Sequence, residues 1–459
     1  MSPLRIIENF TYWTGFSLTG LSFLYVFLPL LLAGYYLLPQ KWRTAFLLVA
    51  SAGYYLLVGS GAASLGGIAA SVLLDALAAR WLTRLDSATP LRRAILWASV
   101  GKNIAFFVVA GLVSRQQDTP FLLGTMVCVL SGISAVVEVY RREEAEPLNL
   151  SEFVLYLGFF PRLHTGPFYT YSHFTAQLRA PKINRNNLLT AFGLYLGGAF
   201  KALVLGGGLN QVYIQLRGFT PADATVFSSW ITLLCFAMTL YFFMAGFAEM
   251  AQGVGLLLGL SLPRDFYYPY QSRNVTDFSQ RFHATLGQIL RRCLFPPSDK
   301  PVPPLGNIGF ALLWGALLGL GFGFRVNNLI WGLYLAVFLL LENYVYPKLL
   351  AAIPVFPGRV YALIVVMLGF TLLAGGTLSE SWAHFCGLFG FVGGGALYND
   401  KILYLLDSNW LLLSTGVLLC SSLADVTGRW LGRVLPRTSR TAYMLLCGAV
   451  LVLYTALAF

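Results

Sequence analysis

The chain has 459 residues, of which 57% are hydrophobic and only 11% are charged, and its formal net charge is +12. About a quarter of the residues in a soluble domain are charged, so this composition excludes an ordinary soluble protein. The basic residues lie in loops beside long apolar runs, which indicates membrane topology and argues against nucleic-acid binding. We predict an all-α polytopic membrane protein, with one integral-membrane domain over residues 1–459 and about 11–13 spans.

A helix needs about 20 mostly apolar residues to cross a bilayer. Arginines and lysines collect on alternate loops, for example at 80–93 and 264–300, whereas the loops near Gly207, Gly323 and Gly376 are poor in charge. The positive-inside rule therefore places the basic loops in the cytoplasm and both termini outside. The apolar runs predict spans at about 15–38, 43–60, 62–80, 94–113, 119–139, 188–207, 227–259, 306–320, 327–346, 359–376, 408–424 and 441–459.

Two stretches are too broken to form simple spans. Residues 151–187 contain a short apolar run that is interrupted by Pro161 and Pro167, and residues 263–305 have the same character. Irregular backbone is tolerated at membrane depth only where it is buried in protein or lines a wet cavity. Both stretches are therefore predicted to be re-entrant or interfacial. Residues 380–400 are predicted to form an amphipathic segment on the outer surface.

The histidines are the first candidates for chemistry. His283 stands in the arginine-rich broken stretch, where it could act as a general base or orient a substrate headgroup, or could bond to a carbonyl in a buried loop. His164, between the two prolines, is predicted to pack or to line a cavity rather than to catalyse. His173 and His384 are predicted to be interfacial. The cysteines show neither disulfide nor zinc spacing.

Charges inside membrane spans are costly and therefore suggest a role. Asp75, Glu138, Glu249 and Glu342 lie within predicted spans. Small residues flank Glu249, which can therefore face a helix interior, either as a polar lock between helices or, less favoured, as part of a conduit. Glu138 and Glu342 lie near cytoplasmic ends, where they are expected to pair with the nearby basic residues Arg141 and Lys348.

Several stretches, taken in order over residues 20–400, resemble the membrane-bound O-acyltransferase family. The resemblance is to its bacterial branch, which acylates exported polymers such as alginate and teichoic acid. The stretches that carry it are Phe159-Phe160-Pro161 with Gly166-Pro167, the span segment Ala245-Gly246-Phe247-Ala248-Glu249, Asp265-Phe266 followed by Pro269-Tyr270, Asp277-Phe278 followed by Arg281-Phe282-His283, and Trp331-Gly332-Leu333-Tyr334. The family has asparagine at the position of Asp265.

One departure from the family pattern affects the chemistry directly. The family's catalytic histidine stands nine residues before the tryptophan that corresponds to Trp331, a position that is Phe322 here. A positioned general base contributes about 10²–10⁴ in rate, and phenylalanine cannot replace it. The resemblance leaves His283 as the candidate catalytic residue. It implies a substrate tunnel lined by Asn327, Trp331, Arg281, Phe322, Glu249 and His164.

Three functions remain open from the sequence. The resemblance implies acyl transfer, with acetyl as the favoured group, to an exported polysaccharide or cell-surface glycopolymer, from a donor such as acetyl-CoA or an acyl carrier protein. It further implies the bacterial inner membrane, and an extracytoplasmic acyltransferase or glycan synthase as partner. Because Phe322 replaces the usual base, an inactive scaffold or acyl conduit for another acyltransferase is the alternative. An unrelated transporter fits the ordered motifs less well.

Overall fold

The computed structural model describes residues 17–20, 22–58, 62–87, 89–117, 123–142, 147–220, 223–296, 302–391 and 396–423. Every regular element within these ranges is helical, which confirms the all-α prediction. The longer helices are α2 (Leu28–Leu37), α3 (Gln40–Val58), α4 (Ala62–Arg84), α5 (Pro90–Gln117), α6 (Leu123–Arg141), α9 (Arg185–Ala199), α10 (Gly207–Arg217), α11 (Val226–Leu257), α14 (Pro304–Gly321), α15 (Val326–Leu340), α17 (Val355–Ala374) and α19 (Asp400–Leu419). Shorter helices are α7 (Leu150–Gly158), α8 (Tyr171–Arg179), α12 (Val275–Arg281), α13 (Ala284–Leu294), α16 (Pro347–Ala352) and α18 (Leu378–Leu388).

Nine helices of the described ranges are long and apolar enough to cross a membrane, so the chain is a multi-pass membrane protein. The predicted span at 15–38 corresponds to a shorter apolar helix, Phe23–Leu37, and the one at 441–459 lies outside the described residues. The nine are Leu65–Arg84, Pro90–Gln116, Gly124–Arg141, Asn186–Arg217, Val226–Leu257, Pro304–Gly321, Val326–Val345, Val355–Ala374 and Asp400–Leu419.

The prediction of an outer loop near Gly207 is wrong. A π-helical segment, Phe200–Gly206, joins α9 to α10 without a break, so this span continues to Arg217. Clustered glycines are a common signal for a turn, but these glycines serve packing instead. A Cβ atom on Gly208 would lie 3.0 Å from the Leu412 side chain of α19.

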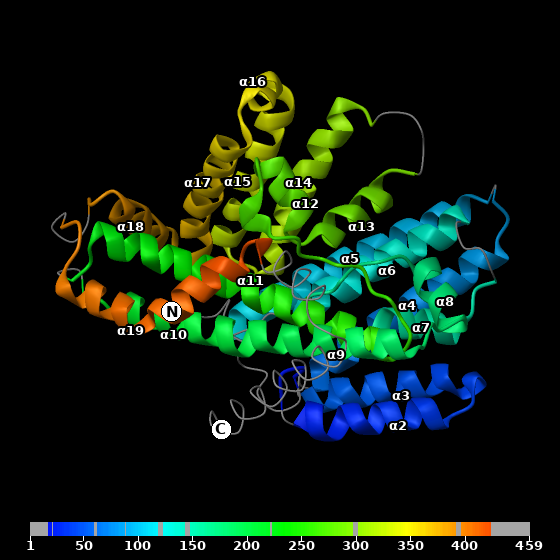
Figure 1. Ribbon diagram of the computed structural model, residues 1–459. Coiled ribbons are helices and arrows are strands. Elements are labelled where there is room, and N and C mark those ends of the chain that lie inside the picture. Colours follow the sequence, from blue (N-terminus) through cyan, green and yellow to red (C-terminus); the bar gives the residue numbers. More distant parts are fainter. Residues whose placement is uncertain are drawn as a thin grey trace.

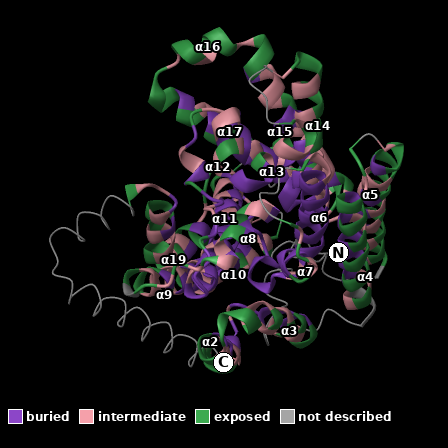
Figure 2. Cartoon of the chain, turned by 90° about the vertical axis from the view of Figure 1, so that its right-hand side faces the viewer, coloured by how far each residue is buried: buried purple, intermediate pink, exposed green. Residues whose placement is uncertain are grey.

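The long helix α11 crosses the middle of the molecule and is buried along most of its length (Figures 1 and 2). Thr225 begins it with a capping box, in which its side chain and that of Ser228 each accept a hydrogen bond from the other residue's backbone N–H. Glycines let α9 pack closely on it, since a Cβ atom on Gly246 would lie 2.6 Å from the Gly198 carbonyl oxygen. Helices α4 and α5, by contrast, are largely exposed, as expected of lipid-facing spans (Figure 2).

Helices α14 and α15 form a tight hairpin around residues 322–325. A Cβ atom on Gly332 would lie 1.8 Å from the carbonyl oxygen of Gly315, so only glycine permits this crossing. Gly323 turns the chain with φ at 128°, a conformation that side chains disfavour. The hairpin brings Phe322 to the end of α14, facing the interior of the protein.

The carboxylates inside the spans hold helices in place. Asp75 contacts Lys102 at 2.8 Å, and Glu249 pairs with Lys201, which agrees with the predicted polar lock. The pairing expected for Glu138 and Glu342 is wrong, because each carboxylate instead caps the start of a short helix. Glu138 accepts backbone N–H groups at the start of α8, and Glu342 does so at the start of α12. Negative charge is favourable there because helix N-termini present unpaired N–H groups.

Candidate active site

His283 lies in the junction between α12 and α13, inside the second broken stretch. Asn274 caps the start of α12, since its side chain accepts a hydrogen bond from the Asp277 N–H, and the helix ends at Arg281. His283 precedes α13 in a left-handed conformation, with φ at 54°. This conformation is uncommon for a residue with a side chain and persists only where the surroundings impose it, frequently at functional sites.

The side chain of His283 is paired with a buried carboxylate. Its Nδ1 lies 2.5 Å from Oδ2 of Asp265, and both residues are buried. The other oxygen of Asp265 accepts hydrogen bonds from the N–H and the hydroxyl of Thr285, at 2.9 and 2.7 Å. Since an ionised carboxylate only accepts hydrogen bonds, this network assigns the proton to Nδ1. The Nε2 atom then keeps its lone pair, which is the arrangement of a general base with an orienting partner.

The two broken stretches meet at this pair. Residues 159–168 are buried throughout, and the Phe168 N–H donates to the hydroxyl of Thr285 at 2.9 Å. His164, Thr165, His283 and Phe322 line one small cavity, together with Met126, Val127, Met244, Leu318 and Gly321. The cavity has a volume of about 10 Å³, which is room for about one water molecule. His283 therefore lies at the same cavity as Phe322, the residue in the family's catalytic position.

Phe322 closes one side of this cavity with an aromatic wall. Its ring packs edge-on against Trp331, with centroids 5.6 Å apart, and Trp331 stacks on Phe370 at 5.9 Å. Phe324, two residues further on, faces α5 instead, where its ring packs against Phe107. Phe322 thus lines the histidine cavity, and Trp331 and Phe370 pack in turn behind it. We call these three residues the aromatic wall.

The other residues expected to line a tunnel have separate positions. His164 lines the cavity with its ring stacked on Phe247, and its Nε2 lies 2.9 Å from the hydroxyl of Tyr54. Asn327 is buried but donates to the Gly375 carbonyl and the Ser381 hydroxyl, so it fastens α15 to α18. Arg281 and Glu249 do not line the cavity. Arg281 instead pairs with Asp277, and Glu249 pairs with Lys201.

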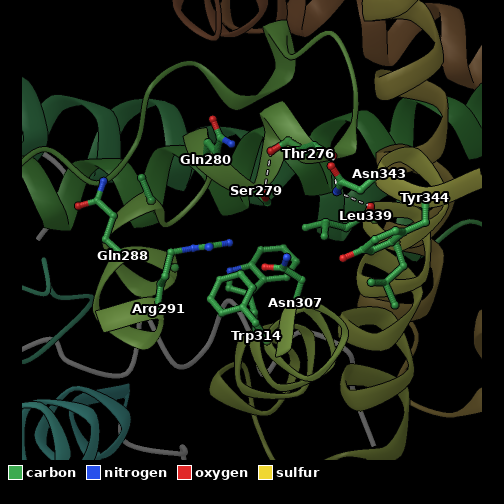
Figure 3. A pocket seen from close by; sticks show the side chains of 14 residues that line it. Thr276, Ser279, Gln280, Gln288, Arg291, Asn307, Trp314, Leu339, Asn343 and Tyr344 are labelled. Carbon is green, nitrogen blue, oxygen red and sulfur yellow. Dashed lines mark hydrogen bonds between the residues drawn. The ribbon is translucent and has the colours of Figure 1, made fainter. Parts of the chain in front are cut away.

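A much larger open pocket lies on the other side of the His283 segment (Figure 3). Its volume is about 770 Å³, within the range of pockets that bind small molecules. Ala284, next to His283, lines this pocket, as does Trp314, one α14 turn before the cavity residue Leu318. The Trp314 indole N–H is buried without a hydrogen-bond partner. The other polar residues that line the pocket are Thr276, Ser279, Gln280, Gln288, Arg291, Asn307, Asn343 and Tyr344 (Figure 3).

Sequence reasoning missed three residues of this site. Asp265 and Thr285 complete the hydrogen-bond network of His283, and Trp314 lines the open pocket one turn of α14 before the cavity residue Leu318. Asp265 could have been found, since an aspartate in a broken membrane stretch that also carries a histidine is a potential partner for it. Thr285 and Trp314 give no such signal, because their side chains are of ordinary types in ordinary helical positions.

Comparisons with known proteins show the family of this chain. The family model described as MBOAT, membrane-bound O-acyltransferase family, matches residues 87–376. This chain belongs to the membrane-bound O-acyltransferase family. The matched part of this O-acyltransferase family member contains both broken stretches, the His283 network and the α14–α15 hairpin.

The names of individual relatives give alginate, peptidoglycan and teichoic acid as what they act on. The chain is 27% identical over 397 residues to the probable alginate O-acetylase of Azotobacter vinelandii, covering 80% of this chain and 77% of the relative. It is 30% identical over 195 residues to the peptidoglycan O-acetyltransferase of Helicobacter pylori, covering 40% and 37%. To the teichoic acid D-alanyltransferase of Bacillus subtilis it is 26% identical over 236 residues, covering 48% and 59%.

Proposed function

We propose that this protein transfers an acyl group, with acetyl as the favoured group, to a hydroxyl of an exported polysaccharide or similar cell-surface glycopolymer. The observation that carries this proposal is the buried Asp265–His283 pair beside a cavity in a member of the O-acyltransferase family. The relatives named above acylate alginate, peptidoglycan and teichoic acid by their names, which supports an acceptor of this class.

The open pocket is the proposed binding site of the acyl donor. It borders Arg291 and a set of uncharged hydrogen-bonding side chains, which suits a donor with a phosphorylated, amide-rich arm such as acetyl-CoA or an acyl carrier protein. The basic stretch around α13 and the C-terminal end of the span Val326–Val345 border this pocket, and the positive-inside rule assigns both to the cytoplasm. In this proposal the protein lies in the inner membrane of a bacterium, and its N-terminus is on the outer side of that membrane.

The proposed reaction uses Nε2 of His283 as the base. An acceptor hydroxyl gives its proton to Nε2, its oxygen forms a bond to the acyl carbonyl carbon, and the bond to the donor sulfur breaks. The proton on His283 then passes to the departing thiolate, which balances the step. Asp265 keeps Nδ1 protonated and stabilises the imidazolium that forms. The cavity must widen for this step, since about 10 Å³ admits no acyl group.

Phe322 favours a second function. It places an aromatic ring, rather than an imidazole, in the family's catalytic position. The protein would then serve as a scaffold or acyl conduit for a separate extracytoplasmic acyltransferase, or within a glycan synthase complex. Both functions need the donor pocket, but only the first needs a base at His283.

Acyl transfer by the purified protein separates the two functions. The protein in lipid nanodiscs is incubated with radiolabelled acetyl-CoA and soluble alginate oligomers, and the label on the sugar is counted. We expect transfer by the native chain and at least a hundred-fold loss in His283→Ala. His173→Ala, at an exposed histidine, is the matched control. Transfer at the native rate by His283→Ala would remove His283 from the mechanism. No transfer by any form, with lost polymer acylation in cells lacking the protein, would favour the scaffold.

A further inference from the structure

A second polar cavity lies far from His283, among α10, α11, α17 and α18. Tyr213, Thr232, Thr371 and His384 contribute polar groups to its lining. Its volume is about 10 Å³, so it can hold one hydroxyl group or one water molecule. Helix α18 lies at the opposite end of the molecule from α8 (Figure 1). The basic loop after α8 is assigned to the cytoplasm, so this cavity is assigned to the outer side.

Charged groups from two helices meet beside this cavity. Arg217 of α10 donates a hydrogen bond to Nε2 of His384, and its guanidinium lies 3.7 Å from the carboxylate of Glu380 on α18. Tyr213 and Arg217 are four residues apart on α10, as are Glu380 and His384 on α18, so each pair shares one helix face. The four side chains, which we call the outer cluster, therefore converge from two facing helices.

One member of the outer cluster lacks a partner. The hydroxyl of Tyr213 is fully buried and has no hydrogen bond, although the residue lines the cavity. A buried hydroxyl without a partner costs free energy, and buried tyrosine hydroxyls usually find one. The nearby Thr232 and Thr371 hydroxyls, by contrast, are each bonded to a backbone carbonyl. The cavity therefore presents one unused donor to whatever enters it.

The outer cluster can be reached from the surface. The Glu380 side chain is 39% exposed and that of Arg217 is 19% exposed. On the outward face of α18, Trp382 is 66% exposed and stacks on Phe385, with ring centroids 5.5 Å apart. Trp382 therefore lies on the other face of α18 from Glu380 and His384. Recognition of a sugar at the outer cluster rests on its polar groups, since paired carboxylate and guanidinium groups can bond to sugar hydroxyls.

We propose that the outer cluster, Tyr213, Arg217, Glu380 and His384, is a binding site for one hydroxyl-rich sugar unit of the acceptor polymer. The sugar ring rests against the Arg217–Glu380 pair, and one hydroxyl enters the cavity to meet Tyr213. This inference rests on the proposed function, since it assumes a glycan acceptor on the outer side. It adds a site that lies across the aromatic wall from His283, because Thr371 of this cavity follows Phe370 of the wall.

The position of the site determines how the acceptor is used. A sugar held in the outer cluster presents its neighbouring units to the aromatic wall and so to the cavity beyond it. The net charge of Arg217 and Glu380 together is zero, so a neutral sugar unit meets no uncompensated charge. The site therefore bonds to sugar hydroxyl groups, which neutral and acidic sugar units both carry.

Sugar binding without any acyl donor tests this inference. The protein in lipid nanodiscs is titrated calorimetrically with chitohexaose and, separately, with an alginate hexamer, and thermal unfolding is recorded without sugar. Tyr213→Phe removes only the unpaired hydroxyl, so we expect about ten-fold weaker binding of the better ligand. We expect unfolding without sugar to be unchanged or shifted to higher temperature. The matched control is Tyr404→Phe, at a tyrosine that is 76% exposed on α19.

Three results would overturn the inference. They are equal affinity in Tyr213→Phe and native protein, no binding of either oligosaccharide, or a lower unfolding temperature for Tyr213→Phe without sugar. The last result would mean that the hydroxyl has a structural partner such as a water molecule. A failure here is distinct from a failure of the proposed function, which shows as acyl transfer that survives His283→Ala whether or not sugar binds.

Discussion

Asp265→Asn tests whether the buried pair acts as a base with its orienting group. The carboxylate now accepts the His283 Nδ1 proton through one oxygen and two hydrogen bonds from Thr285 through the other. An asparagine side chain keeps one accepting oxygen and turns the other position into a donor. The family carries asparagine at this position. The substitution is therefore expected to preserve the fold while it changes which atoms carry the protons.

The magnitude follows from the two orientations open to the new amide. If its oxygen faces Thr285, its NH₂ group faces Nδ1 of His283 and forces the proton onto Nε2, so the base is blocked. If the amide is reversed, its NH₂ group meets the two donors of Thr285 and leaves them unpaired. We expect acyl transfer to fall by about 10²–10⁴, or about 3–5 kcal/mol of barrier. The free energy of unfolding should fall by only about 1–3 kcal/mol.

The assay is the initial rate of label transfer from acetyl-CoA to alginate oligomers, beside a thermal unfolding curve for each variant. Asp277→Asn is the matched control, because that carboxylate pairs with Arg281 at the partly exposed end of α12. A rate for Asp265→Asn within three-fold of the native rate, with normal unfolding, would refute the assignment of Nδ1 and the role of the pair. A loss of rate that follows a loss of folded protein would show a structural role only.

Three further results are expected. Gly332→Ala should abolish recovery of folded protein in size-exclusion chromatography, since its Cβ atom would lie 1.8 Å from a carbonyl oxygen of α14, whereas Gly309→Ala, with no atom within 4 Å, should leave it unchanged. Removing one partner of the Lys201–Glu249 pair should cost roughly 3 kcal/mol in chemical unfolding, and the double variant Lys201→Met, Glu249→Leu should recover part of this loss. Burial, with a neighbouring guanidinium, lowers the pKa of His384 from its ordinary 6.5 to about 4. The unfolded chain therefore takes up a proton first, and thermal stability should fall as pH drops from about 6.5 toward 4, less so in His384→Asn.

Each of these results has a clear contrary outcome. Normal folding of Gly332→Ala would mean that α14 and α15 can separate without loss. Additive losses in the Lys201 and Glu249 variants would deny the ion pair. An equal pH dependence in native protein and His384→Asn would assign the effect to other groups, among which Arg217 and Glu380 face this histidine directly.

The sequence by itself determined the class and most spans of this protein. A continuous apolar run inside lipid must form a helix, because every backbone N–H and C=O group of the run needs a hydrogen-bond partner within the protein. Pro161 and Pro167 likewise marked the first broken stretch, since proline removes a helix hydrogen bond. The same reasoning failed at Gly207, where glycines that read as a turn allow close helix packing instead.

Only the tertiary structure decided which of the candidate residues come together. His283 and Phe322 share a cavity, while Arg281, Asn327 and Glu249 are held in contacts elsewhere. Helix periodicity gives the face on which a residue lies, but it does not give the neighbour that this face will meet. The partnership of Asp265 with His283 depends on an irregular backbone path between two helices, and such a path is set by packing against the rest of the molecule rather than by local sequence.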